Sequence, residues 1–275
     1  MTGEEKREVS LFANNMRKNI IKSIYHARSG HPGGSLSAAD FIAYLYCREM
    51  NVFPDDPHAE DRDRFVLSKG HAAPALYAAL AQKGFFPEED LITLRKHDSY
   101  LQGHPNMNSI PGVDMTSGSL GQGISAAVGM AKGAKILGKN IRVYTLLGDG
   151  ECAEGQVWEA FLFAAHYKLD NLCIAIDVNR LQIDGPTDEV MSTSPLDEKL
   201  RAFNFNVVNV NGHDFDEIEN ALDNFHTTTG KPTVIILNTI KGKGVSFMEN
   251  SVDWHGKAPN EEELNAALKE LEEVR

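Results

Sequence analysis

Two apolar runs joined by a helical segment constrain the fold of this chain more than any other feature. Ile141–Leu147 precedes a polar turn at Asp149, and Leu172–Ile176 precedes Asn179, thirty positions further on. Such runs are typical of buried parallel strands, and the apolar spacing of Glu154–Tyr167 between them predicts a helix. A strand–helix–strand unit brings the carboxyl ends of both strands to one edge of a sheet, where ligands of α/β proteins bind. We therefore expect Asp149 and Asn179 to lie close together.

The residues at these two strand ends suit a divalent metal and a diphosphate. Gly148 and Gly150 flank Asp149, and glycines let a backbone approach a ligand and present N–H groups to an anion. Mg²⁺ prefers oxygen ligands and commonly combines few protein carboxylates with phosphates. A lone Gly-Asp-Gly turn is usually an ordinary connection. Here the spacing and the two strands favour a metal–diphosphate site with Asp149 and Asn179 as ligands.

The rest of the chain continues the alternation of strands and helices. Further strands are predicted at Phe65–Leu67, Asn206–Val210 and Thr233–Leu237, and helices at Glu4–Arg28, Ala38–Arg48, Ile124–Leu137 and Glu261–Glu272. This alternation predicts an α/β fold with a parallel sheet and helices on both faces. Because no repeat or low-complexity linker interrupts the pattern, we expect a single domain over residues 1–275.

Composition restricts the class of protein. The formal net charge of −12 argues against nucleic acid and anionic membranes as partners. The three cysteines show no paired spacing, so a disulfide framework is not expected. Residues 1–8 are polar and charged, unlike a signal peptide, and no apolar run approaches membrane length. These features favour a cytoplasmic enzyme.

Four histidines lie beside glycine in segments that we interpret as loops. They are His31 in SGHPGGSLS, His71 in DRFVLSKGHAA, His104 in QGHP and His255 in WHG. Histidine can hydrogen-bond a phosphate or a sugar hydroxyl and can transfer protons near neutral pH. Any one of them could be structural, but four together favour a site. His213 is interpreted as structural, because the neighbouring Asp214 can cap the helix that follows.

Taken together, these motifs resemble those of the transketolase family. The Gly-Asp-Gly turn with its distant asparagine resembles the thiamine-diphosphate motif, although Val178 stands where that motif commonly carries a first asparagine. The four histidine segments and the glycine loop Thr116–Gly123 (TSGSLGQG) follow in the family's order, from about Ser10 to Pro259. The resemblance implies a thiamine-diphosphate-binding fold that transfers a two-carbon ketol unit from a ketose phosphate to an aldose phosphate. Sugar phosphates of the pentose phosphate pathway are the default substrates that this resemblance implies.

The resemblance also implies roles for individual residues. Mg²⁺ would be held by Asp149, Asn179 and the backbone carbonyl of Leu181, with Gly148 and Gly150 against the diphosphate, and with Gly118 and Leu120 in main-chain contact with the aminopyrimidine. His71 and His255 would contact the diphosphate end and the reacting carbon, while His31 and His104 would line the mouth used by the sugar hydroxyls. Glu154 and Glu159 would lie at an interface between copies and join a proton relay. Lys241 or Lys243 could face phosphate, and a solvated lysine is the competing interpretation.

The length of the chain bears on its partners. In transketolases the glutamate that assists the pyrimidine ring comes from a second domain, whereas this sequence ends at Arg275, shortly after Trp254-His255-Gly256. The resemblance therefore implies the N-terminal subunit of a split transketolase. It would be active only with a partner chain carrying the pyrimidine-binding domain, in an α₂β₂ heterotetramer. The alternatives are a subunit of another thiamine-diphosphate enzyme, such as a 1-deoxyxylulose-5-phosphate synthase or a 2-oxoacid dehydrogenase, and a non-catalytic paralogue.

Overall fold

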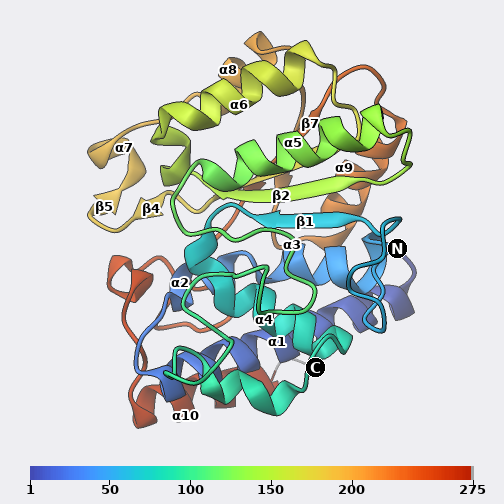
Figure 1. Ribbon diagram of the computed structural model, residues 1–275. Helices are drawn as coiled ribbons and strands as arrows, with labels where there is room; N and C mark the ends of the chain where they lie inside the picture. Colours follow the sequence, from blue (N-terminus) through green and yellow to red (C-terminus); the bar gives the residue numbers. More distant parts are fainter. Residues whose placement is uncertain (274–275) are drawn as a thin grey trace.

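A five-stranded parallel sheet forms the centre of the protein (Figure 1). Its strands run in the order β1-β2-β3-β7-β6. The computed structural model describes residues 1–273, so the last two residues of the predicted domain lie outside the described residues. The strands are β1 (Arg64–Leu67), β2 (Val143–Gly148), β3 (Leu172–Val178), β6 (Asn206–Asn211) and β7 (Thr233–Asn238). The three central strands are buried along almost their whole length. This explains their continuous apolar sequences, because both faces of a parallel sheet are covered.

Helices cover both faces of this sheet (Figure 1). One face carries α5 (Gln122–Ile136), α6 (Gly155–His166) and α8 (Leu196–Ala202). The other carries α1 (Gly3–Ala27), α3 (Ala39–Tyr44), α4 (Ala73–Lys83) and α9 (Phe215–Thr227), with α10 (Glu261–Glu273) packed on α1. Successive residues of β2 alternate between the two cores, since Val143 packs with α5 and Tyr144 with the opposite layer. The predicted α/β fold with helices on both faces is confirmed.

Some predicted boundaries differ from the structure. The predicted strand Ile141–Leu147 begins only at Val143, because the amide of Arg142 donates to the carboxylate of Asp63 at 2.8 Å instead of to a neighbouring strand. The predicted helix Ala38–Arg48 comprises α3 and a π-helical turn, Leu45–Glu49.

Three of the four histidine segments are helical turns and not loops. Pro32 opens the short helix α2 (Pro32–Ser37), with His31 at the preceding position. Proline suits a first helical turn because its missing N–H would have no helical partner there. His71 lies in the 3₁₀ turn Gly70–Ala72, and His255 ends the 3₁₀ turn Val252–His255.

Short connections at the carboxyl ends of the strands form one edge of the sheet. The 3₁₀ turn Gly150–Ala153 follows β2, and a small hairpin of β4 (Leu181–Gln182) and β5 (Gly185–Pro186) follows β3. The helical turn α7 (Thr187–Val190) continues from that hairpin. Elsewhere in the fold, the 3₁₀ turn Glu88–Thr93 lies beside α1. None of the described helices is long and apolar enough to cross a membrane.

Candidate active site

A cavity of about 410 Å³ lies at the carboxyl edge of the sheet. Segments that follow β1, β2, β3 and β7 contribute to its wall, as does the N-terminal end of α2. The predicted site residues that line it are His31, His71, Gly118, Leu120, Gly148, Asp149, Gly150, Glu154, Asn179, Leu181 and His255. The fold therefore brings together residues that lie more than 200 positions apart in the sequence.

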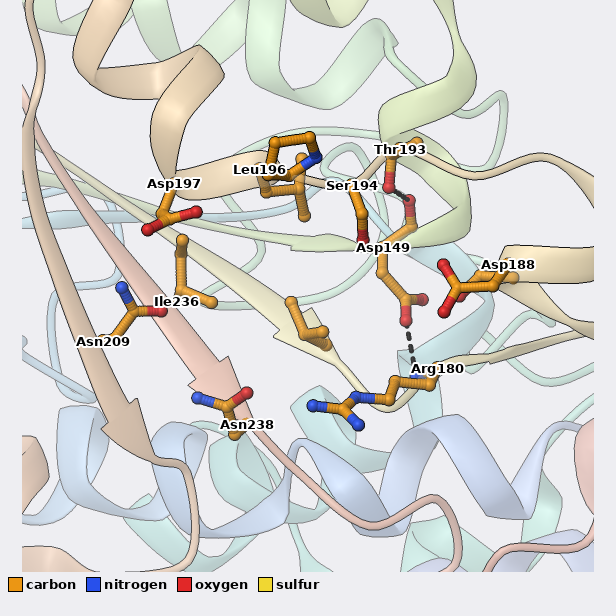
Figure 2. A pocket seen from close by; sticks show the side chains of 13 residues that line it. Asp149, Arg180, Asp188, Thr193, Ser194, Leu196, Asp197, Asn209, Ile236 and Asn238 are labelled. Carbon is orange, nitrogen blue, oxygen red and sulfur yellow. Dashed lines mark hydrogen bonds between the residues drawn. The ribbon is translucent and has the colours of Figure 1, made fainter.

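Asp149 joins the turn after β2 to the loop after β3. Its Oδ1 accepts a hydrogen bond from the amide of Gly150 at 2.8 Å, and its Oδ2 accepts one from the amide of Arg180 at 2.6 Å. Figure 2 shows the latter bond from a neighbouring cavity that Asp149 also lines. Burial, together with the nearby charge of Asp177, raises the pKa of Asp149 to about 6. A cation beside this carboxylate would favour its charged form.

Asn179 is oriented by its neighbours. Its Nδ2 donates to the carboxylate of Asp177 at 3.2 Å, and its Oδ1 accepts from the amide of Leu181 at 3.1 Å. Asp177 is itself fully buried and also binds Lys69 and the hydroxyls of Ser37 and Thr239. Burial raises the pKa of Asp177, but the ammonium of Lys69 and the hydrogen bonds outweigh it and hold the pKa below its usual value.

The structure distinguishes between the two lysines that the sequence left open. Lys241 is 2% exposed and lines the cavity, whereas Lys243 is partly exposed and lies 3.4 Å from Glu249. The Nζ of Lys241 donates to the carbonyl of Leu181 at 2.9 Å. Its stem passes over Gly33, where a Cβ would come within 2.9 Å of Lys241 Cγ. Burial, and then the charge of Lys69, lowers the pKa of Lys241 to about 8.

Three histidines form a cluster beside these lysines. The ring centroids of His31, His71 and His255 lie 5.3 to 5.6 Å apart. Burial first, and then neighbouring cations, lowers the pKa of His31 to about 4, that of His255 to about 3 and that of His71 well below its ordinary value. The three rings are therefore neutral at pH 7. The Nδ1 of His255 lies 2.8 Å from the ammonium of Lys241, so it accepts that proton and Nε2 carries the ring hydrogen.

His104 lies apart from this cluster, against the glycine loop. It does not line the cavity, and a Cβ on Gly118 would come within 3.0 Å of His104 Cγ. Gly118 has a φ of 145°, which favours glycine. A Cβ on Gly70 would also collide with the backbone nitrogen of Gly118, at 2.6 Å. The backbone of the glycine loop is thus packed directly on the segment that carries His71.

Glu154 and Glu159 differ in their relation to the cavity. Glu154 stands just before α6 and lines the cavity, whereas Glu159 is exposed on α6 and does not line it. Exposed apolar side chains accompany them on α5, on α6 and in the turns that follow: Ile136, Leu137, Leu162, Phe163 and Tyr167.

Sequence reasoning missed three buried charged residues of the cavity edge: Lys69, Glu151 and Asp177. Each is at most 2% exposed. Burial raises the pKa of Glu151, while hydrogen bonds from Ser68, Gly121 and Gly148 act in the opposite direction. Charged groups are rarely buried without a partner. Their positions at the end of a strand, or within three residues of it, place them at this edge of the sheet but do not show that they are buried.

The residues of the cavity fit a diphosphate and a hard divalent cation. The Nδ1 of His31 and the Nε2 of Gln182 are buried without a hydrogen-bond partner among the described residues. The buried ammonium groups of Lys69 and Lys241 suit an anion. No cluster of three or more His, Cys, Asp or Glu within residues 1–273 could hold a metal. Mg²⁺ does not need such a cluster, because it also binds one carboxylate together with amide and carbonyl oxygens.

Comparisons with known proteins point to one family. Residues 9–272 match the family model described as "Transketolase, thiamine diphosphate binding domain". The 6-deoxy-6-sulfo-D-fructose transketolase subunit of a Clostridium species is 47% identical over 98% of this chain and 98% of its own length. One of the apulose-4-phosphate transketolase subunits, from Phocaeicola vulgatus, is 42% identical over 94% of this chain and 91% of its own length.

Solved structures agree with these matches. The transketolase from Leishmania mexicana superposes with a TM-score of 0.90 and 33% identity over 96% of this chain. That from Campylobacter jejuni superposes with a TM-score of 0.90 and 32% identity over 99% of this chain. This chain covers 41% and 43% of those two proteins. It therefore belongs to the transketolase family, as an N-terminal subunit that binds thiamine diphosphate, and the resemblance of its motifs is confirmed.

Proposed function

We propose that this chain and a partner chain carrying a pyrimidine-binding domain form a transketolase that moves a two-carbon ketol unit from a ketose phosphate to an aldose phosphate. The observation that carries the proposal is the composition of one cavity. Oxygen donors, two buried lysines and three neutral histidines share its wall. Anion binding and proton transfer both need such groups in one place.

Asp149, Asn179 and the carbonyl of Leu181 would hold Mg²⁺, and Gly148 and Gly150 would lie against the diphosphate. All five residues line the cavity. The carboxylate of Asp149 and the amide of Asn179 are held by successive backbone amides, those of residues 180 and 181. This arrangement supports the proposal because a metal site needs ligands whose orientation is set before binding. Lys241 would add a positive charge beside the diphosphate.

The histidines would handle protons and sugar hydroxyls. Bound thiamine diphosphate supplies the electron sink on which a two-carbon unit can be carried. Neutral imidazoles can accept a proton at a free ring nitrogen and return it. His71 and His255 would contact the diphosphate end and the reacting carbon, while His31 and His104 would bind sugar hydroxyls near the mouth.

The partner would complete the cofactor site. Gly118 and Leu120 line the cavity and would contact the aminopyrimidine through their main chain. The glutamate that assists this ring would come from the partner, because transketolases supply it from the domain that follows this region. The relatives named as subunits, which have nearly the same length as this chain, support a two-chain enzyme.

Two copies of each chain would form an α₂β₂ heterotetramer. We place the contact between two copies of this chain on α5 and α6, where Glu154 and Glu159 would join a proton relay between sites. Exposed apolar side chains on that surface, including Leu162 at 60% and Phe163 at 40% exposure, support the placement. Large exposed apolar patches commonly mark protein interfaces.

The substrates would be anionic ketoses and aldoses. One relative is named for 6-deoxy-6-sulfo-D-fructose and two others for apulose 4-phosphate. We propose sugar phosphates of the pentose phosphate pathway as the default substrates and include the sulfonated ketose in the test.

A cytoplasmic location is supported by the three free cysteines, Cys47, Cys152 and Cys173, because disulfides are rare in a reducing compartment.

Ketol transfer assays on the separate and mixed chains test this function. Each chain alone, the mixture, and the mixture without Mg²⁺ receive a ketose donor and an aldose phosphate, and the new ketose is quantified. Xylulose 5-phosphate, apulose 4-phosphate and 6-deoxy-6-sulfofructose serve as separate donors. We expect product only from the mixture with Mg²⁺. Robust transfer by this chain alone, or no transfer by the mixture with any donor, would contradict the proposal.

A further inference from the structure

Glu151 is a buried carboxylate beside the diphosphate turn (Gly148–Gly150), and the roles proposed above make no use of it. Its side chain is 2% exposed and lines the cavity. Its Oε1 accepts hydrogen bonds from the hydroxyl of Ser68 at 2.5 Å and from the amide of Gly121 at 2.9 Å. Its Oε2 accepts one from the amide of Gly148 at 3.1 Å. One side chain thus binds three separate segments.

Each of these segments carries residues proposed to contact the cofactor. Ser68 directly follows β1 and precedes the turn that holds His71. Gly121 belongs to the glycine loop, which precedes α5. Gly148 ends β2 and opens the diphosphate turn. Glu151 is therefore placed to determine how the loop that would face the aminopyrimidine sits relative to the turn that would face the diphosphate.

The segment after β1 and the glycine loop approach each other closely at two glycines. A Cβ on Gly70 would lie 2.6 Å from the backbone nitrogen of Gly118, and a Cβ on Gly123 would lie 2.6 Å from the Cα of Ser68. Glycines at these positions allow close packing but offer no side chain that could fix a relative position. Hydrogen bonds to Glu151, together with the bond from the amide of Ile124 to the hydroxyl of Ser68, supply that specificity.

The surroundings of Glu151 require an acceptor at both oxygens. The hydroxyl oxygen of Ser68 accepts a hydrogen bond from the amide of Ile124 at 3.0 Å, so the hydroxyl proton is free to point at Glu151. The other two neighbours, Gly121 and Gly148, are backbone N–H donors. A carboxylate satisfies all three donors. A carboxamide of the same shape would direct its NH₂ group against at least one of them.

We propose that Glu151 is a positioning residue for the cofactor, which holds the glycine loop in register with the diphosphate turn. This inference rests on the proposed function, because it assigns the turn to the diphosphate and the loop to the aminopyrimidine. Glu151 acts through the backbone of Gly121 and Gly148. Its loss should therefore affect the binding of the whole cofactor more than the binding of a diphosphate alone.

Glu151→Gln in the two-chain complex tests this, with calorimetric titration of thiamine diphosphate and, separately, inorganic pyrophosphate, both with Mg²⁺. We expect thiamine-diphosphate affinity to fall about 10- to 100-fold and pyrophosphate affinity to change less than about threefold, as for loss of a supporting partner. Glu198→Gln on the exposed surface of α8 is the matched control and should change neither affinity. Hydrogen exchange should become faster at the amides of Gly121 and Gly148 and remain unchanged in β3.

Ser68→Ala is the milder second variant, because it removes one donor and keeps the carboxylate. It should reduce thiamine-diphosphate affinity in the same direction by a smaller factor. Equal losses for both ligands, or no loss for either, in Glu151→Gln would overturn the positioning role. The failure of the proposed function looks different, since the unmodified complex would then transfer no ketol unit or would bind neither ligand.

Discussion

The ammonium nitrogen of Lys241 lies 2.9 Å from the carbonyl oxygen of Leu181, which is one of the three oxygens proposed to bind Mg²⁺. A buried positive charge therefore already points at the proposed metal site. The same nitrogen lies 2.8 Å from Nδ1 of His255, so it also links that site to the histidine cluster. We infer that metal binding and the position of Lys241 are coupled, because both cations would lie at one carbonyl oxygen, which has a lone pair for each.

Lys241→Met should weaken the binding of thiamine diphosphate and of pyrophosphate alike. Methionine keeps the unbranched stem that packs over Gly33 but removes the charge. A hydrogen bond to a charged group contributes about 1.5–3 kcal/mol, so affinity should fall roughly 10- to 150-fold. Calorimetry on the two-chain complex measures the loss. Lys243→Met, which removes the neighbouring lysine that pairs with Glu249, is the control and should bind both ligands normally. Equal affinities in the two variants would refute the assignment of Lys241 to the diphosphate.

Asp149→Asn should remove the metal dependence of cofactor binding. The variant loses the charge, and its amide NH₂ would face either the amide of Gly150 or that of Arg180, both of which donate to Asp149. Loss of a supporting residue costs 10- to 100-fold in metal affinity, so loss of a ligand should cost at least about 100-fold. Titrations of thiamine diphosphate with and without Mg²⁺ measure this. Asp184→Asn, on the exposed turn of the β4–β5 hairpin, should retain the difference between the two titrations.

The location of the site could be predicted from the sequence, because residues that follow neighbouring parallel strands lie at the same edge of the sheet. Asp149 and Asn179 each follow a buried strand, and neighbouring parallel strands end at the same edge. The structure links them through successive amides of the loop after β3, which bind the two side chains in turn. The order of strands in the sheet was not predicted, since β7 lies between β3 and β6 although it follows both in the sequence.

The buried charges could not be predicted in the same way. Lys69 and Asp177 are fully buried only because they face each other from the ends of two different strands, β1 and β3. Nothing within the local sequence of either residue identifies its partner. The choice between Lys241 and Lys243 was open for a similar reason, since a two-residue spacing in a loop does not determine which side chain points inward. Tertiary contacts decide these orientations.

His31 should lower the free energy of unfolding of the unliganded chain as the pH decreases from about 6.5 to about 4. Its pKa is about 4 in the folded protein and 6.5 ordinarily. The unfolded chain therefore binds more protons in this window, which favours unfolding as the pH falls, and above it the contribution is constant. One proton corresponds to at most about 1.4 kcal/mol per pH unit, and partial exposure of His31 reduces this value.

Comparison with His31→Gln isolates this contribution, because acid also titrates many carboxylates in both proteins. Urea unfolding at several pH values gives the difference in unfolding free energy between the two. We expect the difference to move in favour of the variant as the pH falls from about 6.5 to about 4.5 and to stay level from about pH 7 to about pH 8. A difference that is independent of pH over both ranges would show that His31 is not buried in its neutral form.

Leu162→Asp should prevent association between copies of this chain. Leu162 lies on α6 with 60% of its side chain exposed, in the surface that we assign to the contact between two copies. A charge in the buried centre of an interface is unfavourable, and substitutions at such positions commonly cost about 2 kcal/mol or more, so the dissociation constant should rise at least about 30-fold. Folding should be unaffected, since substitutions on an exposed surface usually change stability by less than about 0.5 kcal/mol.

Ile92→Asp is the matched control, because Ile92 is 43% exposed in the 3₁₀ turn beside α1, on the other side of the sheet. Sedimentation velocity over a concentration series separates the outcomes: the control should sediment as the unmodified protein does, and Leu162→Asp as a smaller species. Identical sedimentation of all three proteins would place the contact elsewhere.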